Sequence, residues 1–100
     1  MANVYISEYQ SLAIDLTGRH CAAGEEPAIA SQKIAIGGSS AQSAAFDDTT
    51  KIARIHADEV CSIVFGADPT ATSAGARLAA GQTEYFGVKP GHKVAVITNS

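Results

Sequence analysis

The side chains that could do chemistry in this chain are three histidines, two cysteines and a few loop acids. His20 and Cys21 are adjacent, whereas His56, Cys61 and His92 are isolated along the chain. A zinc site needs three or four ligands and usually contains a close pair such as Cys-x-x-Cys or His-x-x-x-His, and neither spacing occurs. Adjacent residues of a strand also point to opposite faces, so His20 and Cys21 make a poor pair. The spacing therefore predicts no metal site.

Nucleophilic catalysis requires a serine or cysteine activated by a histidine that an acid positions. No serine lies in a Gly-x-Ser-x-Gly turn. Ser62 falls inside an apolar segment, where a strand hydroxyl normally points to solvent or bonds a threonine across the sheet. Cys61 could in principle form a catalytic dyad with His56 or His92, but any small protein with cysteines and three histidines allows such a pairing. We therefore expect no catalytic residue and no enzyme.

Two further patterns were weighed as ligand sites. Residues 37–40, Gly-Gly-Ser-Ser, would bind a phosphate if a helix began there, but the following residues alternate as a strand does. The acidic pairs at 25–26 and 47–48 lack the spacing of a calcium loop. We expect a turn and solvated acids, and no cofactor.

Composition limits the classes of partner. The 100 residues fit one domain, and the net charge of −3 argues against a nucleic-acid surface. No stretch approaches the roughly 20 apolar residues that span a bilayer, and the chain begins without the pattern of a signal peptide. We therefore expect cytoplasmic synthesis with free thiols. Nineteen alanines and no tryptophan predict a modest core, to which burial against a partner can add.

Short apolar or alternating runs separated by turn residues indicate an all-β domain. The expected strands lie at residues 4–9, 12–17, 29–36, 41–46, 51–57, 60–65, 76–79, 83–88 and 92–98. Turns at 37–40 and at Lys89-Pro90-Gly91 predict hairpins, and residues 18–28 read as a polar connection. A helix over 8–16 competes with the strand there, and the alternation in 51–57 does not show which face is buried. The pattern predicts a single-domain antiparallel β-sandwich or barrel, jelly-roll or immunoglobulin-like, over 1–100.

Two segments favour binding over catalysis. Residues 1–16 either form the first strand or reach as an arm onto a neighbouring subunit, because apolar side chains would be wasted at a free terminus. The loop at 67–75 is rich in small residues that allow close approach to a flat partner, although a plain flexible loop is equally compatible. The predicted interface residues are Val4, Tyr5, Ile6, Tyr9, Leu12, Asp68, Pro69 and Thr70.

The second half of the chain resembles small all-β proteins of tailed-bacteriophage virions, commonly capsid decoration or cement proteins. The resemblance covers residues 30–98 and rests on five runs: Ile63-Val-Phe-Gly66, Asp68-Pro-Thr-Ala-Thr72, Arg77-Leu-Ala-Ala-Gly81, Glu84-Tyr-Phe-Gly-Val88 and Gly91-His-Lys-Val-Ala-Val-Ile97. It implies a non-enzymatic virion protein that is made in the bacterial cytoplasm and stabilises the head. Its expected partners are the major capsid protein or other virion proteins, with self-association as a dimer or trimer and no contact with nucleic acid or membrane.

Two alternatives stay open. The first is a head–tail connector or tail component. The second is a small cupin-like or carbohydrate-binding module, which requires a concave pocket lined by some of the three tyrosines and three phenylalanines.

Overall fold

The computed structural model describes residues 2–14, 18–24 and 26–99, and for 12–14 and 20–23 it describes the backbone alone. All strand pairs in this part of the chain are antiparallel. The first sheet has the order β4 (Ala30–Ala35), β1 (Asn3–Tyr9), β6 (Ile52–Ala57) and β9 (Thr83–Gly87). The second has the order β5 (Ala41–Gln42), β10 (Lys93–Thr98), β7 (Cys61–Gly66) and β8 (Ala76–Leu78). The predicted β-sandwich is confirmed.

The core lies between the two sheets and follows the alternation of each strand. In the first sheet the ambiguous segment resolves, because Ala53, Ile55 and Ala57 of β6 are fully buried while Arg54 and His56 face outward. The side chains that form the main buried cluster are Val4, Ile6, Ile34, Phe46, Ala53, Ile55, Ala57, Cys61, Ile63, Leu78, Val94 and Val96. Phe65 of the second sheet contacts Phe86 of the first, with ring centroids 5.1 Å apart. The rings join the sheets, because offset aromatic pairs add to the free energy of burial.

The two predicted hairpins, at 37–40 and at 89–91, are wrong. The turn at 37–40 joins β4 of the first sheet to β5 of the second, and the turn at 89–91 joins β9 to β10 in the same way. The tight turn at 58–59 also crosses, from β6 to β7. A turn signal specifies a reversal of direction only. Here the strands on either side bury their apolar faces against each other across the core and do not pair edge to edge.

The chain crosses between the sheets at β4–β5, β5–β6, β6–β7, β8–β9 and β9–β10. An immunoglobulin sandwich keeps more consecutive strands in one sheet. The alternation is therefore closer to the jelly-roll option than to the immunoglobulin option. The strand expected at 76–79 is present as the edge strand β8, whereas the strand expected at 41–46 keeps regular pairing only over Ala41–Gln42.

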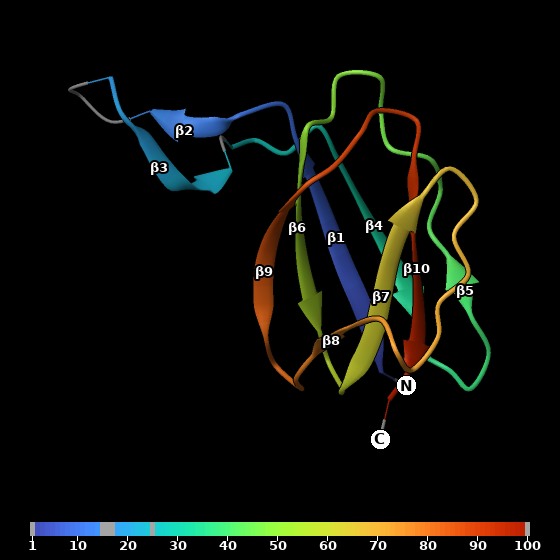
Figure 1. Cartoon of the computed structure of the whole chain (residues 1–100). Coiled ribbons are helices and arrows are strands. Elements are labelled where there is room, and N and C mark those ends of the chain that lie inside the picture. The colour runs from blue at the N-terminus through green and yellow to red at the C-terminus, as the bar shows by residue number, and fades with distance from the viewer. Residues whose placement is uncertain (1, 15–17, 25, 100) are drawn as a thin grey trace.

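The amino-terminal segment is the first strand of the domain, since β1 lies between β4 and β6. After β1 the chain leaves the sandwich as a two-stranded ribbon of β2 (Leu12–Ile14) and β3 (His20–Gly24), which projects to one side (Figure 1). The ribbon contradicts both the helix over 8–16 and the polar connection over 18–28; residues 15–17 and 25 lie outside the described part. Alanine and glycine give β3 little strand signal of their own, and pairing with β2 supplies its order.

Among the described residues no helix is long and apolar enough to cross a membrane.

Candidate functional site

The outer face of the first sheet carries two adjacent rows of side chains that run across all four strands. The first row is Lys33, Tyr5, His56 and Thr83, and the second row is Ser31, Ser7, Arg54 and Tyr85. These residues alternate with the buried positions of their strands, so they point away from the core. We call the eight residues the open face.

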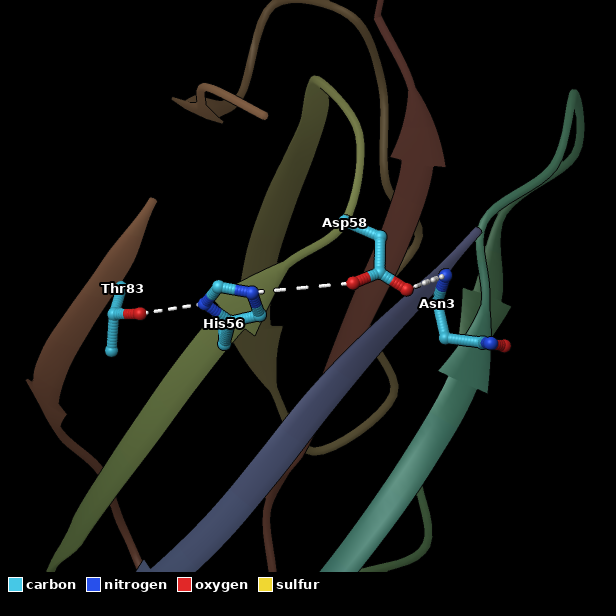
Figure 2. A network of polar contacts seen from close by, with 4 residues as sticks. All are labelled: Asn3, His56, Asp58 and Thr83. Atoms are coloured by element: carbon cyan, nitrogen blue, oxygen red, sulfur yellow. Dashed lines mark hydrogen bonds and ion pairs between the residues drawn. The ribbon is translucent and has the colours of Figure 1, made fainter. Parts of the chain in front are cut away.

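A polar network ties three strands together at one end of the open face (Figure 2). The His56 Nδ1 lies 2.6 Å from the Thr83 Oγ1, directly across the β6–β9 pair. The His56 Nε2 lies 4.0 Å from the Asp58 Oδ1, and the Asn3 backbone N–H donates to the Asp58 Oδ2 at 3.1 Å. The side chains of His56 and Asp58 are about one-third exposed. This network can orient the imidazole and hold the end of β1 beside the turn after β6.

The network has the residue types of a nucleophilic triad but not the setting of one. Thr83 and His56 are neighbours on a flat, solvated sheet surface, where such pairs are ordinary cross-strand contacts. A working triad also needs donors placed around a developing oxyanion and exclusion of water. These contacts are explained by a structural role, in which the His56 imidazole links β6 to Thr83 of β9 and to Asp58.

A groove runs over the first two strands of the open face. It encloses about 450 Å³, is open to solvent, and is lined mainly by Tyr5, Ser7, Ser31 and Lys33. Tyr5 and Tyr85 are 42% and 38% exposed, which is high for aromatic side chains in a sheet. Among the described residues the one ion pair on this face is the histidine–aspartate contact, so Lys33 and Arg54 keep unpaired charges.

The root of the ribbon closes one end of the open face. Tyr9 extends from the outer side of β1 but is only 2% exposed. The Gly24 backbone lies against its ring so closely that a Cβ at Gly24 would overlap the ring atoms. The Tyr9 hydroxyl donates to the Glu26 carboxylate at 2.7 Å. Burial, and then the Glu26 contact, raise the pKa of the Tyr9 phenol above its ordinary value. The ribbon is thereby fixed to the sandwich at its base.

Glu8 is a buried carboxylate that the sequence analysis missed. It is 2% exposed and points inward from β1. Its oxygens accept from the Asp47 backbone N–H at 2.9 Å, the Thr50 hydroxyl at 2.9 Å and the Gln32 amide at 3.1 Å. These donors satisfy the charge, and Glu8 joins β1, β4 and the 47–50 turn. The alternation of Val4, Ile6 and Glu8 was the signal that this acid faces inward.

The predicted amino-terminal interface needs a correction. Val4, Ile6 and Tyr9 are buried within the chain itself, at 0%, 1% and 2% exposure, so they do not present a surface to a partner. Their side chains complete the core and the ribbon root, which is the first-strand alternative. Tyr5 is exposed on the open face, and the Leu12 side chain lies outside the described part of the chain.

The predicted loop interface is an ordered segment rather than a flexible loop. Residues 67–75 run along the outer face of the second sheet, and we call this segment the strap. The Gln42 amide donates to the Asp68 carboxylate at 2.9 Å and to the Pro69 carbonyl at 2.7 Å. Pro69 is buried, whereas Asp68 and Thr70 are exposed. Asp68 and Thr70 therefore remain available to a partner, and Pro69 does not.

The strap is held at two more points. The Ser40 hydroxyl accepts from the Ala71 N–H at 2.8 Å, and Ala71 is buried. The Asn99 amide donates to the Ser73 carbonyl at 3.2 Å and to the Ser62 hydroxyl at 2.6 Å. Ser62 is fully buried and bonds Asn99, whereas the sequence indicates a hydroxyl that faces solvent or bonds a threonine across the sheet.

The structure keeps the remaining candidate side chains apart. Cys61 points into the core from the second sheet, while His56 lies on the outer face of the first. His92 precedes β10, whereas Cys61 pairs with Thr98 at the far end of that strand, roughly 20 Å away at about 3.3 Å per residue. Burial raises the pKa of the Cys61 thiol. The side chains of His20 and Cys21 lie outside the described part.

In the described residues no three or more histidine, cysteine, aspartate and glutamate side chains come together as metal ligands would. Comparison with protein-family models, with curated protein sequences and with solved structures finds no match.

Proposed function

We propose that this chain is a non-enzymatic structural protein of a tailed-phage virion, which decorates or cements the capsid by contacting its subunits. The resemblance over residues 30–98 motivates this role. The observation that carries it is the ribbon of β2 and β3, which extends from the sandwich while its base is fixed at Tyr9 (Figure 1). A fixed arm on a rigid body is the geometry required to bridge neighbouring subunits.

The ribbon has a physical reason to find a partner. A two-stranded ribbon alone is marginally stable in water, because it lacks a second layer to cover an apolar face. The sequence of β2, Leu-Ala-Ile over residues 12–14, is apolar throughout. Burial of these residues against a capsid subunit would stabilise the ribbon and the contact. The interface is then formed by the ribbon, with Asp68 and Thr70 as a second contact.

Self-association belongs to the same proposal. Decoration at symmetry axes of a shell calls for dimers or trimers, in which one surface patch repeats around the axis. The exposed side chains that remain from the predicted interface, Tyr5, Asp68 and Thr70, lie on opposite outer faces of the sandwich. One of them can serve a neighbouring copy while the ribbon contacts the shell.

The test is cosedimentation with phage particles purified from a strain that carries this gene. The full chain is expected to sediment with the particles, and a variant in which residues 11–24 are replaced by a short glycine linker is expected to stay in the supernatant. Arg77→Gln, an exposed change on the second sheet, is the control and should bind as the parent does.

Electron microscopy of the same particles locates the protein. Density at junctions between capsid subunits agrees with cementing, whereas density at the tail moves the assignment to the connector or tail alternative. A chain that is monomeric by size exclusion and fails to sediment with particles contradicts the proposal.

A further inference from the structure

We propose that the open face is a binding site for an acidic oligosaccharide, one that carries carboxylate or sulfate groups. This inference rests on the two rows of side chains and not on the ribbon, and Tyr5 is the one residue that it shares with the self-association contact proposed above. It rests on two exposed tyrosines, two unpaired cations and three hydroxyl groups that lie together on one face of the sheet.

The aromatic rings set the length of the ligand. Tyr5 lies on β1 and Tyr85 on β9, two strands apart and therefore roughly 10 Å apart across the sheet. The Arg54 side chain lies in the row of Tyr85, and His56 lies beside Tyr5 with ring centroids 6.4 Å apart. Sugar rings that stack on both tyrosines would pass over Arg54 and His56. A short oligosaccharide fits this span, and a single sugar does not.

The charge of the rows selects an acidic ligand. The rows contain Lys33, Arg54 and His56 and no carboxylate, although the whole protein carries a net charge of −3. Asp58, the nearest acid in the network, is engaged by the Asn3 N–H. A guanidinium binds a carboxylate or sulfate through two parallel hydrogen bonds. Ser7 and Ser31 in the groove supply partners for sugar hydroxyls.

Other ligand classes fit less well. Enclosed apolar pockets are typical of small-molecule sites, and this groove is open to solvent. Protein interfaces are depleted in lysine and serine, and hot spots are depleted in serine and threonine, yet half of the open face consists of these types. Single-stranded nucleic acid also stacks on aromatic rings, but its affinity depends on many more cations than two.

The experiment titrates the full chain with an oligogalacturonate of four to six sugars, observed by amide chemical shifts. Shifts are expected on β1, β6 and β9, and affinity should fall as salt rises. Arg54→Gln should weaken binding about tenfold, the loss of one charge-assisted contact. Tyr5→Ala should weaken it by a similar factor. Arg77→Gln, an arginine on the outer face of the opposite sheet, should leave affinity within about twofold.

Three further ligands make the outcome decisive. A sulfated oligosaccharide of equal length should bind through the same residues, and a neutral maltooligosaccharide should bind more weakly. Equal binding of the neutral sugar, or an affinity that Arg54→Gln leaves unchanged, overturns the proposal. Tighter binding of an oligothymidylate at equal salt assigns the face to nucleic acid instead and also overturns it, as does the absence of shifts with every ligand. Circular dichroism of each variant shows that the fold is intact.

Discussion

The two outer faces of the sandwich differ in what covers them. On the second sheet the strap lies over β7, β10 and β5, and Ser62 and Ala95 beneath it are fully buried although both point away from the core. On the first sheet the equivalent surface is the open face, where Tyr5 and Tyr85 keep 42% and 38% of their surface exposed. In the described part of the chain the root of the ribbon lies at one end of this face, at Tyr9.

The difference separates structural from functional surface. The covered face presents small groups, Ser62 and Ala95, which match a strap built from alanine, proline and threonine. The open face presents Lys33, Arg54 and two exposed tyrosines, of which Tyr85 contacts the ring of Tyr9 with centroids 6.3 Å apart. Exposed aromatic side chains that gather on one face are typical of a binding surface. Ligand binding is therefore expected on the first sheet, whereas the covered second sheet contributes mainly to stability and offers a partner Asp68 and Thr70 of the strap.

The largest expected effect comes from placing a charge on each face in turn. Ala95→Asp places a carboxylate at a fully buried position and should lower the free energy of unfolding by about 3 kcal/mol. The matched change on the open face, Ser7→Asp, lies beside Arg54 and should alter it by no more than about 0.5 kcal/mol. Urea unfolding of the two variants measures both changes in the free energy of unfolding. Equal losses would show that the strap does not close the second sheet.

A smaller effect is expected where the strap is anchored. Gln42→Ala removes the amide that bonds Asp68 and Pro69, and should cost about 1–2 kcal/mol for two hydrogen bonds. Amide hydrogen exchange should speed up in residues 67–75 while the first sheet is unaffected. Gln10→Ala, an exposed glutamine before the ribbon, is the control. Unchanged exchange in the strap would mean that its packing, and not this side chain, holds it.

The contrast between the faces also shows how far the sequence could be interpreted. Apolar or alternating runs between turn residues were sufficient for most strands, as with Val4 and Ile6, which repeat with the period of a strand, and with residues 60–65, which are apolar on both faces. Residues 4–9, 29–36, 51–57, 60–65, 83–88 and 92–98 were therefore placed correctly to within two residues. β3 was missed because His20–Gly24 has no alternation of its own and depends on β2 for its pairing.

The sequence could not predict which strands pair or which segment covers a sheet, because both depend on residues that are far apart in the chain. The turn at 89–91 is the same in a hairpin as in a crossing between sheets, so β9 and β10 were paired wrongly. The rows of the open face bring together Lys33, Tyr5, His56 and Thr83 from four strands, and only the register shows that they are neighbours. Likewise, Gln42 and Asn99 give no local sign that they hold residues 67–75.

The pH dependence of stability tests whether the second sheet shields the Cys61 thiol from solvent. Burial holds its pKa above the ordinary value, so the folded state favours the neutral thiol. The unfolded chain then loses its proton first, and the stabilisation is complete below the ordinary thiol pKa and declines as the pH rises above it. Alkaline unfolding should consequently be delayed in Cys61→Ser relative to the parent, once the general loss from the substitution is measured at pH 7.

The rate at which Cys61 is alkylated gives a kinetic version of the same test. In a Cys21→Ser background, iodoacetamide should modify Cys61 no faster than the protein unfolds globally. The Gln42→Ala change should accelerate this reaction only if the strap, in addition to the sheet, shields the thiol. Rapid modification of the folded parent would contradict a closed second sheet.

The smallest expected effect compares two hydrogen bonds of equal length. The His56–Thr83 contact on the open face and the Asn99–Ser62 contact under the strap both measure 2.6 Å. Double-mutant cycles with His56→Ala and Thr83→Val, and with Asn99→Ala and Ser62→Ala, give the coupling energy of each pair. Because water replaces a lost partner on the open face, we expect about 0.3 kcal/mol there. Removal of Asn99 leaves a buried hydroxyl without its donor, so we expect about 1 kcal/mol or more under the strap. If the exposed pair has the larger coupling, solvation does not distinguish the two faces, and the reason for assigning binding to one and stability to the other is lost.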